Sequence, residues 1–453
     1  MAGLSEALVL VIGAGPAGIF TAQALAEREI HAILLNRDIR PGGLAEYGIY
    51  HSKHRVKQAL RSQFHKILRL PEVEYFGNVT VAEDGDLTLD RLREMGFSAI
   101  VAAVGAQGTK WLGLPGEDLV GVYHAKDLIY YYNRLPPFSE HEFEIGKRVA
   151  LIGVGNTMVD IARWLVRDVE VDEVVAVARR GPAEVKFTRN ELAYVAANMD
   201  LAALDEEIAR VSARMEAVGQ DPEAAKDFIL SALDGAPEPS SDTQVRFRFL
   251  SAPSRILGDD SGRVAGLEVE NTALVLNEEG ETKPKRLDTY HVLNVDTVVF
   301  CIGDRVSEDF GLPTEWFSFV KHPEPCYPTD GISFEAYDPT AGEPIDGVFI
   351  VGWARKASRG QVGLARKDAR NCVESLVAYL SDRAPLPDPK AARDALMAEL
   401  GALDKPVVTT EEALRLAELE AAEAKARHDP GFRFATNAEM LEALGRTGKS
   451  GIS

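Results

Sequence analysis

The N-terminal segment shows a regular succession of apolar and small residues that predicts strands and a helix. Residues 7–12 (ALVLVI) are continuously apolar, a glycine-containing turn follows, and a second apolar run ends at Asn36. Short continuous apolar runs are typical of strands buried on both faces of a parallel sheet. The pattern therefore predicts a strand–turn–helix–strand unit over residues 7–36.

The same plan returns in the middle of the chain. Residues 147–181 (KRVALIGVGNTMVDIARWLVRDVEVDEVVAVARRG) contain an apolar run, a glycine turn, a helical segment and a second apolar run that ends at Ala178. Two further apolar runs end in glycine-containing turns, at 99–118 and 297–305, and they could mark crossings between domains. Residues 200–235 are predicted to form inserted helices, and the Ala- and Glu-rich segment 410–427 a surface helix.

Composition narrows the class of protein. With 453 residues, 46% hydrophobic and 26% charged, the chain should form a soluble protein of two or three domains. A net charge of -20 argues against non-specific binding to nucleic acid or to an anionic membrane, although it does not exclude a local basic patch. The apolar stretch at 7–26 is interrupted by glycines and a proline and lacks a basic leader, so neither a membrane span nor a signal peptide is predicted.

The three cysteines, Cys301, Cys326 and Cys372, lie far apart in the sequence. They contain no C-x-x-C pair and cannot supply the four thiolates of an iron–sulfur cluster, so no metal site is predicted. Such sparse cysteine usage suits a reducing, cytoplasmic compartment.

The first glycine turn has the spacing of a dinucleotide-binding loop. Gly13 would allow the tight turn, Gly15 the close approach of a pyrophosphate, and Gly18 the packing of helix on strand, with Pro16 and Ala17 opening the helix. The helix N-terminus would direct its N–H groups at the phosphates. Asn36 occupies the position of the usual acidic residue and could still hydrogen-bond a ribose hydroxyl.

The second turn differs in its selectivity. Gly153 and Gly155 form the turn and are followed by Asn156 and Thr157, and no third glycine follows. Where an NAD site would carry a carboxylate, this chain has the adjacent pair at 179–180, Arg179 and Arg180. Guanidinium groups bind a 2′-phosphate by charge-assisted bonds. The arginines therefore predict NADPH at the second site and FAD at the first.

Several motifs together resemble adrenodoxin-reductase-like ferredoxin–NADP reductases, within the glutathione-reductase-type flavoprotein superfamily. The matching segments are GAGPAGIFTAQAL, GLPGED, GVGNTMVDIARWLV, ARRGPAEVKFTRNEL, GVFIVGWARK and PGFRFATNAEMLEAL. The resemblance covers nearly the whole chain. One departure is the stretch PGGLAEYGI with a following lysine, which is more like the NADPH-oxidising β subunit of glutamate synthase.

The resemblance implies further site residues. Glu191 would lie near the nicotinamide, and Lys53 and His54 are candidate polar neighbours of the flavin, so these three are the candidate catalytic residues. The remaining candidates for cofactor contact follow apolar strands or glycine turns; they are Gly43, Leu44, Tyr47, Gly48, Val104, Gly105, Gly352, Trp353, Gly360, Gln361 and Val362.

The predicted fold is α/β, with two Rossmann-like, three-layer dinucleotide-binding domains and a helical C-terminal extension. The FAD-binding domain would be discontinuous, and the NADPH-binding domain would carry the helical insert at 200–240. The predicted ranges are 1–108 and 331–384 for the FAD-binding domain, 109–330 for the NADPH-binding domain, and 385–453 for the extension.

The predicted activity is hydride transfer from NADPH to FAD, with electrons then passed singly to a ferredoxin-like protein. Two basic clusters, 53–66 and 355–370, could attract such an acidic partner. A subunit of a larger complex and a reductase or monooxygenase of a small molecule stay open as alternatives, as does the oligomeric state. A disulfide reductase would need a cysteine pair beside the flavin, which the sequence lacks.

Overall fold

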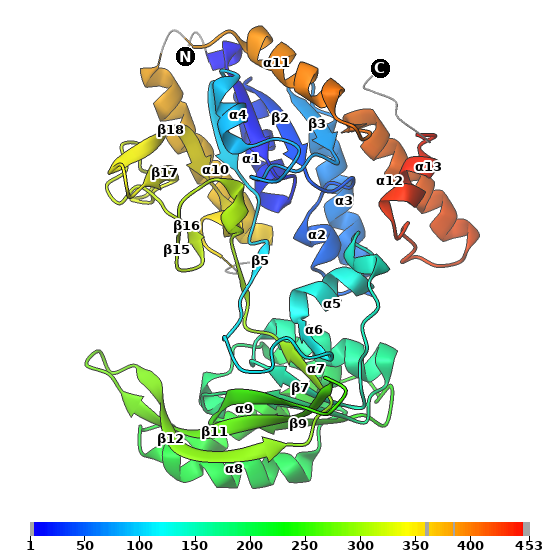
Figure 1. Cartoon of the computed structure of the whole chain (residues 1–453), viewed down its shortest axis with the longest axis vertical. Helices are drawn as coiled ribbons and strands as arrows, with labels where there is room; N and C mark the ends of the chain where they lie inside the picture. Colours follow the sequence, from blue (N-terminus) through cyan, green and yellow to red (C-terminus); the bar gives the residue numbers. More distant parts are fainter. Residues whose placement is uncertain (1–3, 358–361, 384–385, 447–453) are drawn as a thin grey trace. The chain divides into compact units, whose positions relative to one another are not determined.

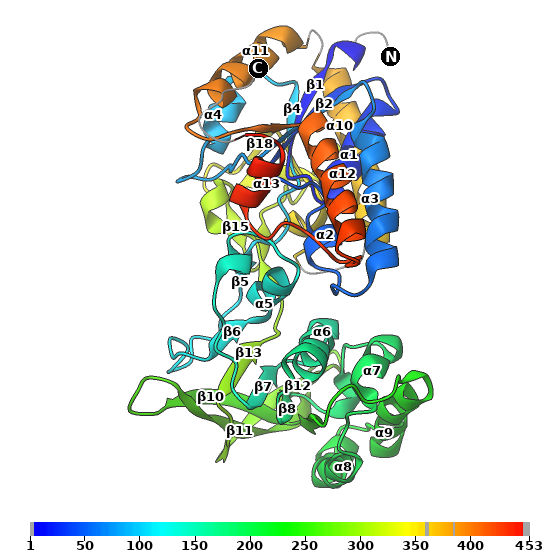
Figure 2. The same ribbon diagram turned by 90° about the vertical axis from the view of Figure 1, so that its right-hand side faces the viewer.

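The computed structural model describes residues 4–357, 362–383 and 386–446. These residues form two compact units (Figures 1 and 2). The first unit comprises residues up to 108, 130–140 and those from 304 onward, and the second comprises 109–129 and 141–303. The chain passes between the units at four places, and two of them, 108–109 and 303–304, lie within the glycine-containing segments that predicted a crossing. The other two lie at 129–130 and 140–141.

The first unit is built on a seven-stranded sheet in the order β17-β18-β4-β1-β2-β3-β19. The five central strands are parallel, whereas β17 and β19 run antiparallel at the two edges. All five residues of β1 are buried, as expected for a strand covered on both faces. The strands are β1 (Leu8–Ile12), β2 (His31–Asn36), β3 (Val73–Gly77), β4 (Ala99–Ala102), β17 (Glu335–Asp338), β18 (Glu343–Ile350) and β19 (Val408–Thr409).

Helices cover both faces of this sheet (Figure 1). On one face, α1 packs against α10 and α3, and their apolar residues join the core that contains Val9, Val11 and Leu34. The other face buries Leu8, Leu10 and Ile12. The helices are α1 (Pro16–Ala26), α2 (Leu44–Tyr47), α3 (His54–Leu68), α4 (Leu89–Glu94), α10 (Val362–Asp382), α11 (Pro389–Ala402), α12 (Thr410–Ala426) and α13 (Asn437–Ala443).

The second unit repeats the plan with a five-stranded parallel sheet in the order β6-β13-β7-β8-β9. A three-stranded antiparallel sheet, β10-β11-β12, contributes Ile256, Leu267 and Val269 to a core shared with the parallel strands. The parallel strands are β6 (Val122–His124), β7 (Arg148–Ile152), β8 (Glu173–Val177), β9 (Gln244–Arg248) and β13 (Thr297–Phe300). The antiparallel strands are β10 (Ser251–Gly258), β11 (Val264–Leu276) and β12 (Thr282–Leu293).

The helices of the second unit include those of the predicted insert. Helices α8 and α9 lie between β8 and β9 in the sequence, and α8 packs on β9 and β11. The helices are α6 (Asn156–Trp164), α7 (Arg189–Ala196), α8 (Leu201–Glu216) and α9 (Pro222–Leu230), and α5 (Ala125–Tyr132) lies where the chain passes between the units.

The observed architecture confirms the predicted fold class, with two differences in the domain boundaries. Residues 130–140 and residues 304–330 were assigned to the NADPH-binding domain, but both segments lie in the first unit. For residues 304–330 the reason is apolar packing, because Phe310, Leu312 and Phe319 join the core that contains Leu8 and Leu10.

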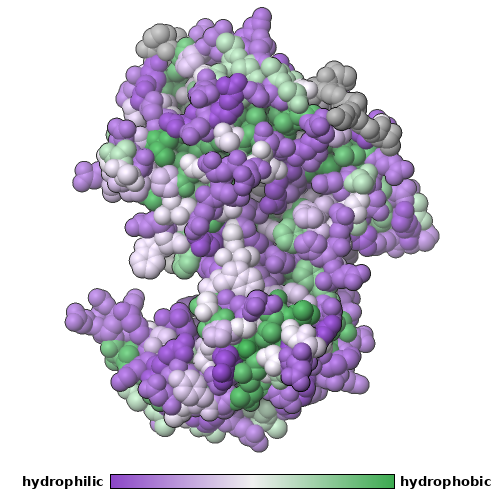
Figure 3. Space-filling view, in the orientation of Figure 1, coloured by the Kyte–Doolittle hydropathy of each residue, from purple (hydrophilic) through white to green (hydrophobic). Residues whose placement is uncertain are grey.

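The C-terminal extension is part of the first unit. Its short strand β19 pairs with β3 through Val408 and Thr409, and helix α12 follows on from it. The visible molecular surface is largely hydrophilic, with smaller apolar patches (Figure 3). Among the described residues, no helix has the length and apolar character needed to cross a membrane.

Candidate dinucleotide-binding sites

The turn between β1 and α1 depends on two close backbone contacts. Gly13 has φ +104°, and a Cβ there would lie 2.6 Å from the carbonyl oxygen of Ala103. A Cβ at Gly18 would lie 1.9 Å from the carbonyl oxygen of Gly13. A side chain at position 18 would force the helix away from the strand, and one at position 13 would clash with the backbone that follows β4. The spacing of the motif is therefore required by packing as well as by a ligand.

Three other predicted segments meet at the start of α1. A Cβ at Gly43 would lie 2.8 Å from Gly15 Cα, and one at Gly352 would lie 2.6 Å from Ala17 Cβ. A Cβ at Gly13 would lie 3.1 Å from Val104 Cα. The structure thus gathers the 13–18, 43–48, 104–105 and 352–354 segments into one cradle of mostly backbone atoms. Val362 begins α10, which packs on α1, whereas Gly360 and Gln361 lie outside the described residues.

Asn36 holds this glycine loop to the end of β2. Its buried side chain accepts a hydrogen bond from Ala14 N through Oδ1 at 3.0 Å. Its Nδ2 donates to the carbonyls of Asp38 and Arg40 at 2.8 and 3.1 Å, and lies 3.2 Å from the Tyr75 hydroxyl. A carboxylate could not make these donations, which explains why an amide stands here. A ribose hydroxyl could still donate to Oδ1, and that contact stays a prediction.

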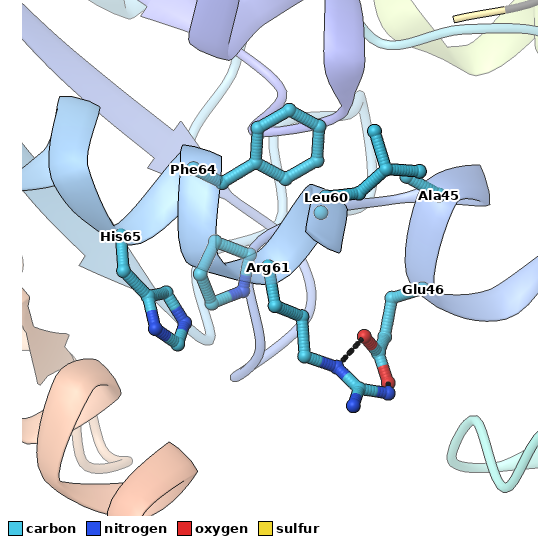
Figure 4. Close-up of a pocket in the computed structure, with 8 residues that line it drawn as sticks. Ala45, Glu46, Leu60, Arg61, Phe64 and His65 are labelled. Atoms are coloured by element: carbon cyan, nitrogen blue, oxygen red, sulfur yellow. Dashed lines mark hydrogen bonds and ion pairs between the residues drawn. The ribbon is translucent and has the colours of Figure 1, made fainter. Parts of the chain in front are cut away.

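A buried carboxylate, Glu46, anchors α2 to α3. Arg61 of α3 binds it in bidentate fashion at 2.5 and 2.6 Å, beside a small pocket lined by both helices (Figure 4). Arg433 from the C-terminal extension approaches the same carboxylate at 3.3 Å. Burial acts to raise the pKa of Glu46, but the hydrogen bonds and charge of Arg61 outweigh it and lower that pKa.

A second buried carboxylate, Glu420 of α12, lies next to the first. Arg40 Nε donates to it at 2.9 Å, and the backbone N–H of Phe434 donates at 3.1 Å. Arg40 also donates to the Phe434 carbonyl at 2.5 Å and lies 3.5 Å from the Tyr47 hydroxyl. Arg433 lies between the two carboxylates, 3.6 Å from Glu420. The extension is therefore bound to the segment that contains the predicted cofactor contacts Gly43, Leu44 and Tyr47.

Lys57 completes this network from inside α3. Its buried ammonium donates to Asn133 Oδ1 at 2.7 Å, and Asn133 Nδ2 donates to the Tyr47 carbonyl at 2.8 Å. Burial lowers the pKa of Lys57 to about 8, although the charge of Glu46 acts in the opposite direction. The Tyr47 side chain is buried in the protein interior. Its backbone N–H donates to the Gly43 carbonyl, and its carbonyl accepts from Asn133.

The two flavin-side candidates Lys53 and His54 occupy the start of α3. Lys53 is the N-cap residue of the helix, and its backbone N–H donates to the Tyr50 carbonyl at 3.0 Å. The His54 ring lies against the extension, because a Cβ at Gly431 would lie 2.9 Å from His54 Cε1. Burial, Lys57 and His51 lower the pKa of His54. The catalytic roles of Lys53 and His54 stay predictions.

The basic clusters are less exposed than the sequence indicated. Lys57 is buried, Arg61 is bound to Glu46, and Arg355 is buried in an ion pair with Asp368. These three cations serve the fold and cannot dock a partner, which corrects the expectation for both clusters. Exposed basic side chains in the same segments are Arg55, Lys66, Lys356, Lys367 and Arg370.

In the second unit, the turn between β7 and α6 leaves open space. Gly153 has φ +118°, and a Cβ there would lie 2.6 Å from the carbonyl oxygen of Cys301. A Cβ at Gly155 would meet no atom within 4 Å among the described residues. Gly155 is the N-cap residue of α6, so the helix N-terminus faces this space with Asn156 and Thr157 as its first residues.

The segment after the two arginines is fastened over this turn. The Val154 carbonyl accepts hydrogen bonds from the backbone N–H groups of Lys186 and Phe187 at 2.8 and 3.2 Å. Asn156 Oδ1 accepts from Thr188 N at 2.9 Å, and Thr188 in turn caps α7 at the N–H of Glu191. Asn156 is thus partly engaged in the fold, and Glu191 lies in the first turn of α7. The structure brings Glu191 to the same edge of the sheet as the glycine turn.

The two arginines after β8 differ in their surroundings. Arg180 donates to Glu184 Oε1 at 3.0 Å, and Glu184 also accepts a hydrogen bond from the Thr282 hydroxyl. Arg179 is exposed, and its backbone carbonyl is fixed by the Thr272 hydroxyl at 2.8 Å. An anion would therefore compete with Glu184 for Arg180 but would meet the Arg179 guanidinium at the surface.

Sequence reasoning missed the carboxylates Glu46 and Glu420 and their partner Arg433. Arg40 lies 380 residues from Glu420 in the chain, so no local spacing links them. The one sequence signal for this network was the acidic residue Glu46 inside the otherwise uncharged PGGLAEYGI stretch.

Three comparisons with known proteins agree with this geometry. The sequence profile described as pyridine nucleotide-disulphide oxidoreductase matches residues 8–219. The NADPH-ferredoxin reductase FprA of Mycobacterium leprae is 28% identical over 415 residues, covering 82% of this chain and 84% of that protein. The mitochondrial NADPH:adrenodoxin oxidoreductase of Arabidopsis thaliana is 26% identical over 406 residues, covering 83% of this chain and 81% of that protein. The structure of Mycobacterium tuberculosis FprA in complex with NADPH matches with a TM-score of 0.79 at 26% identity, covering 97% of this chain and 99% of that one.

The fold, the two glycine turns and these relatives support an oxidoreductase. The chain is similar to the adrenodoxin-reductase-like ferredoxin–NADP reductases, as its motifs predicted.

The hydrogen bonds of Asn36 give a first prediction. Asn36→Asp should lower the free energy of unfolding by about 1–3 kcal/mol, because a carboxylate cannot donate to the two buried carbonyls. Chemical denaturation of both proteins measures this difference. Asn437→Asp, at the exposed start of α13, is the matched control and should be nearly neutral. Equal stability of Asn36→Asp and the unchanged protein would contradict the assignment.

Lys57 gives a second prediction, on pH dependence. The folded protein releases the Lys57 proton near pH 8, whereas an unfolded chain keeps it up to about pH 10.4. Between these values the unfolded state binds more protons, so the contribution of Lys57 to stability rises with pH. The unfolding free energy of the unchanged protein, relative to Lys57→Met, should therefore increase across this window. Lys66→Met, on the exposed face of the same helix, is the control for the loss of a lysine. If the difference in unfolding free energy between the unchanged protein and Lys57→Met does not vary with pH, the prediction is refuted.

Proposed function

We propose that the chain is an NADPH-dependent flavoprotein reductase that passes electrons singly to a ferredoxin-like iron–sulfur protein. The observation that carries the proposal is the pairing of two glycine-turn cradles, one per unit, that differ after their second strands: the exposed Arg179 follows β8, whereas Arg37, which follows β2, is paired with Asp38. One cradle suits a dinucleotide without a 2′-phosphate and the other suits NADPH.

The first unit supplies a cradle that fits FAD. Side chains at Gly43 and Gly352 would clash with the start of α1, and the bare backbone at these two positions and at Gly15 would allow a pyrophosphate to approach. When bound, the flavin accepts hydride from NADPH and releases single electrons. The chain's own part is to hold the 43–48 segment in place through Glu46, Lys57 and Asn133.

The second unit supplies the selectivity for NADPH. Its open turn at Gly155 and the N-terminus of α6 would bind the pyrophosphate, while Arg179 would bind the 2′-phosphate. Glu191, at the start of α7, would lie toward the nicotinamide and help to orient it. The orientation of the nicotinamide is the contribution that the protein makes to the hydride transfer.

The electron acceptor would be recognised by charge. The exposed cations Lys356, Lys367 and Arg370 follow the Gly352 edge of the FAD cradle, and the backbone N–H of Lys356 donates to the Gly352 carbonyl. A small acidic iron–sulfur protein would be attracted to such a surface. The few cysteines, of which Cys301 and Cys372 are buried, are in keeping with a reducing compartment such as the cytoplasm.

The test of the proposal uses the purified full chain. It should carry FAD, be reduced anaerobically by NADPH, and transfer electrons to a ferredoxin from the same source. Reduction of the flavin by NADPH without transfer to any ferredoxin would shift the assignment to a different acceptor. A protein that takes up no FAD on reconstitution would refute the proposal as a whole.

The different surroundings of the two arginines predict unequal effects. Arg179→Ala should weaken NADPH binding roughly ten- to a hundredfold, the value of one charge-assisted bond, with little change for NADH. Arg180→Ala should have a smaller effect because Glu184 already neutralises this arginine. Dissociation constants of both coenzymes measure this, with Arg189→Ala, an exposed arginine paired to Asp234, as the control. Equal loss for NADPH and NADH in Arg179→Ala would contradict phosphate selection.

The exposed cations predict a salt-sensitive encounter. Ferredoxin reduction should slow as ionic strength rises, mainly through the association rate. Lys356→Glu should reduce that rate at low salt and leave NADPH-dependent reduction of a small neutral dye unchanged. Lys390→Glu, an exposed lysine on α11, serves as the control for the change in net charge. A rate that does not depend on ionic strength would rule out docking by charge.

A further inference from the structure

A group of cations lies in the second unit apart from the glycine turn and the 179–180 pair. It consists of Arg210 and Arg214 on α8, Arg248 at the end of β9, and His291 on β12, gathered around the buried carboxylate of Glu207. We call these four basic residues the Arg248 cluster. Helix α8 packs on β9 and β11, and β12 pairs with β11, so three separate elements contribute to the cluster (Figure 1).

The shared carboxylate is already fully used. Glu207 Oε1 accepts hydrogen bonds from Phe249 N and Arg210 Nη2, both at 2.6 Å. Its Oε2 accepts from Arg210 Nε at 2.8 Å and from Arg248 Nη1 at a long 3.5 Å. One negative charge therefore balances three guanidinium groups. The cluster carries an excess of positive charge in a half-buried place.

Two hydrogen-bonding nitrogens in the cluster have no acceptor in the described part of the chain. His291 Nδ1 lies 3.5 Å from Arg248 Nη2, and when it accepts that bond its Nε2 carries the proton. His291 Nε2 and Arg248 Nε are both buried, and neither has a hydrogen-bond partner among the residues that the structure describes. Buried donors are normally paired, so this arrangement calls for an acceptor from outside the chain.

Electrostatic repulsion among the cations of the cluster also favours binding of an anion. Burial lowers the pKa of Arg248, and the neighbouring Arg210 and Arg214 lower it further. Burial and the charge of Arg248 likewise lower the pKa of His291. A bound anion would offset both effects, because opposite charges nearby favour the protonated forms. The side chains of Arg210 and Arg248 keep 25% and 22% of their surface exposed, so a small ion can reach them from solvent.

We propose that the Arg248 cluster is a binding site for a phosphate group, distinct from the arginine that selects the dinucleotide. Three guanidinium groups and an imidazole N–H offer the converging donors that a tetrahedral oxyanion accepts. The site is also linked to the coenzyme site. Arg214 donates to the Thr272 carbonyl at 3.1 Å, and the Thr272 hydroxyl donates to the Arg179 carbonyl.

The phosphate could come from a free phosphate or small phosphate ester, or from the 2′-phosphate of NADPH itself. The test measures binding of inorganic phosphate to the flavin-loaded full chain by calorimetry, first alone and then with saturating NADP⁺. We expect saturable binding of one phosphate that persists with NADP⁺ present. Displacement of the phosphate by NADP⁺ would assign the cluster to the coenzyme site and overturn the proposal.

Variants of the cluster test whether its residues bind the phosphate. Arg248→Gln should weaken phosphate binding roughly ten- to a hundredfold, whereas Arg246→Gln should not. Arg246 belongs to the same strand but is already paired with Glu173 and Asp200. Should Arg248→Gln fail to fold, Arg214→Gln removes a cation from the partly exposed side of α8 and should weaken binding as well. Absence of saturable binding, or equal loss in Arg246→Gln, would refute the site.

Discussion

The contact of backbone on backbone where β1 meets α1 is the constraint on which the first unit depends. The carbonyl of Gly13 occupies the space in which any other residue at position 18 would carry a Cβ. This contact places the helix directly over the strand and leaves the helix N-terminus at the carboxyl edge of the sheet. The 43–48 and 352–354 segments can then reach the same point because Gly43 and Gly352 also lack side chains. The cradle is therefore a consequence of four close approaches and needs few polar side chains of its own.

Buried charge has a different role in this molecule. The network of Arg40, Glu46, Arg61, Glu420 and Arg433 joins α2 and α3 to the C-terminal extension. Such pairs add little to stability compared with apolar packing, but the loss of one partner leaves an uncompensated charge at a cost of about 3–5 kcal/mol. The network thus fixes one arrangement of the 41–48 segment, because other arrangements would separate these charges. It also explains why a C-terminal helix is firmly attached to a segment near the N-terminus.

In the second unit, some of the positive charges are exposed or are not balanced by carboxylates. Arg180 is neutralised by Glu184, whereas Arg179 stays exposed at the end of β8. Beyond them, the Arg248 cluster holds more cations than its one carboxylate balances. Both units are built on a parallel sheet with a glycine turn but differ in electrostatics, and under the proposed function this difference would separate a site for a coenzyme with an extra phosphate from one for a coenzyme without it.

The sequence alone determined the strand–turn–helix–strand units, the two nucleotide cradles and the basic pair after β8, because each is encoded over a few dozen neighbouring residues. Apolar runs define buried strands, and glycine spacing defines the turn between them. The sequence alone could not show which cations face solvent. Lys57 and Arg61 lie on the same helix as the exposed Arg55 and Lys66. However, Lys57 donates to the side-chain amide of Asn133, and Arg61 binds the Glu46 carboxylate of α2. The place of residues 304–330, the attachment of the extension and the Arg248 cluster were likewise decided by tertiary structure. In each of these, the free energy comes from groups far apart in the chain, which leave no local pattern to read.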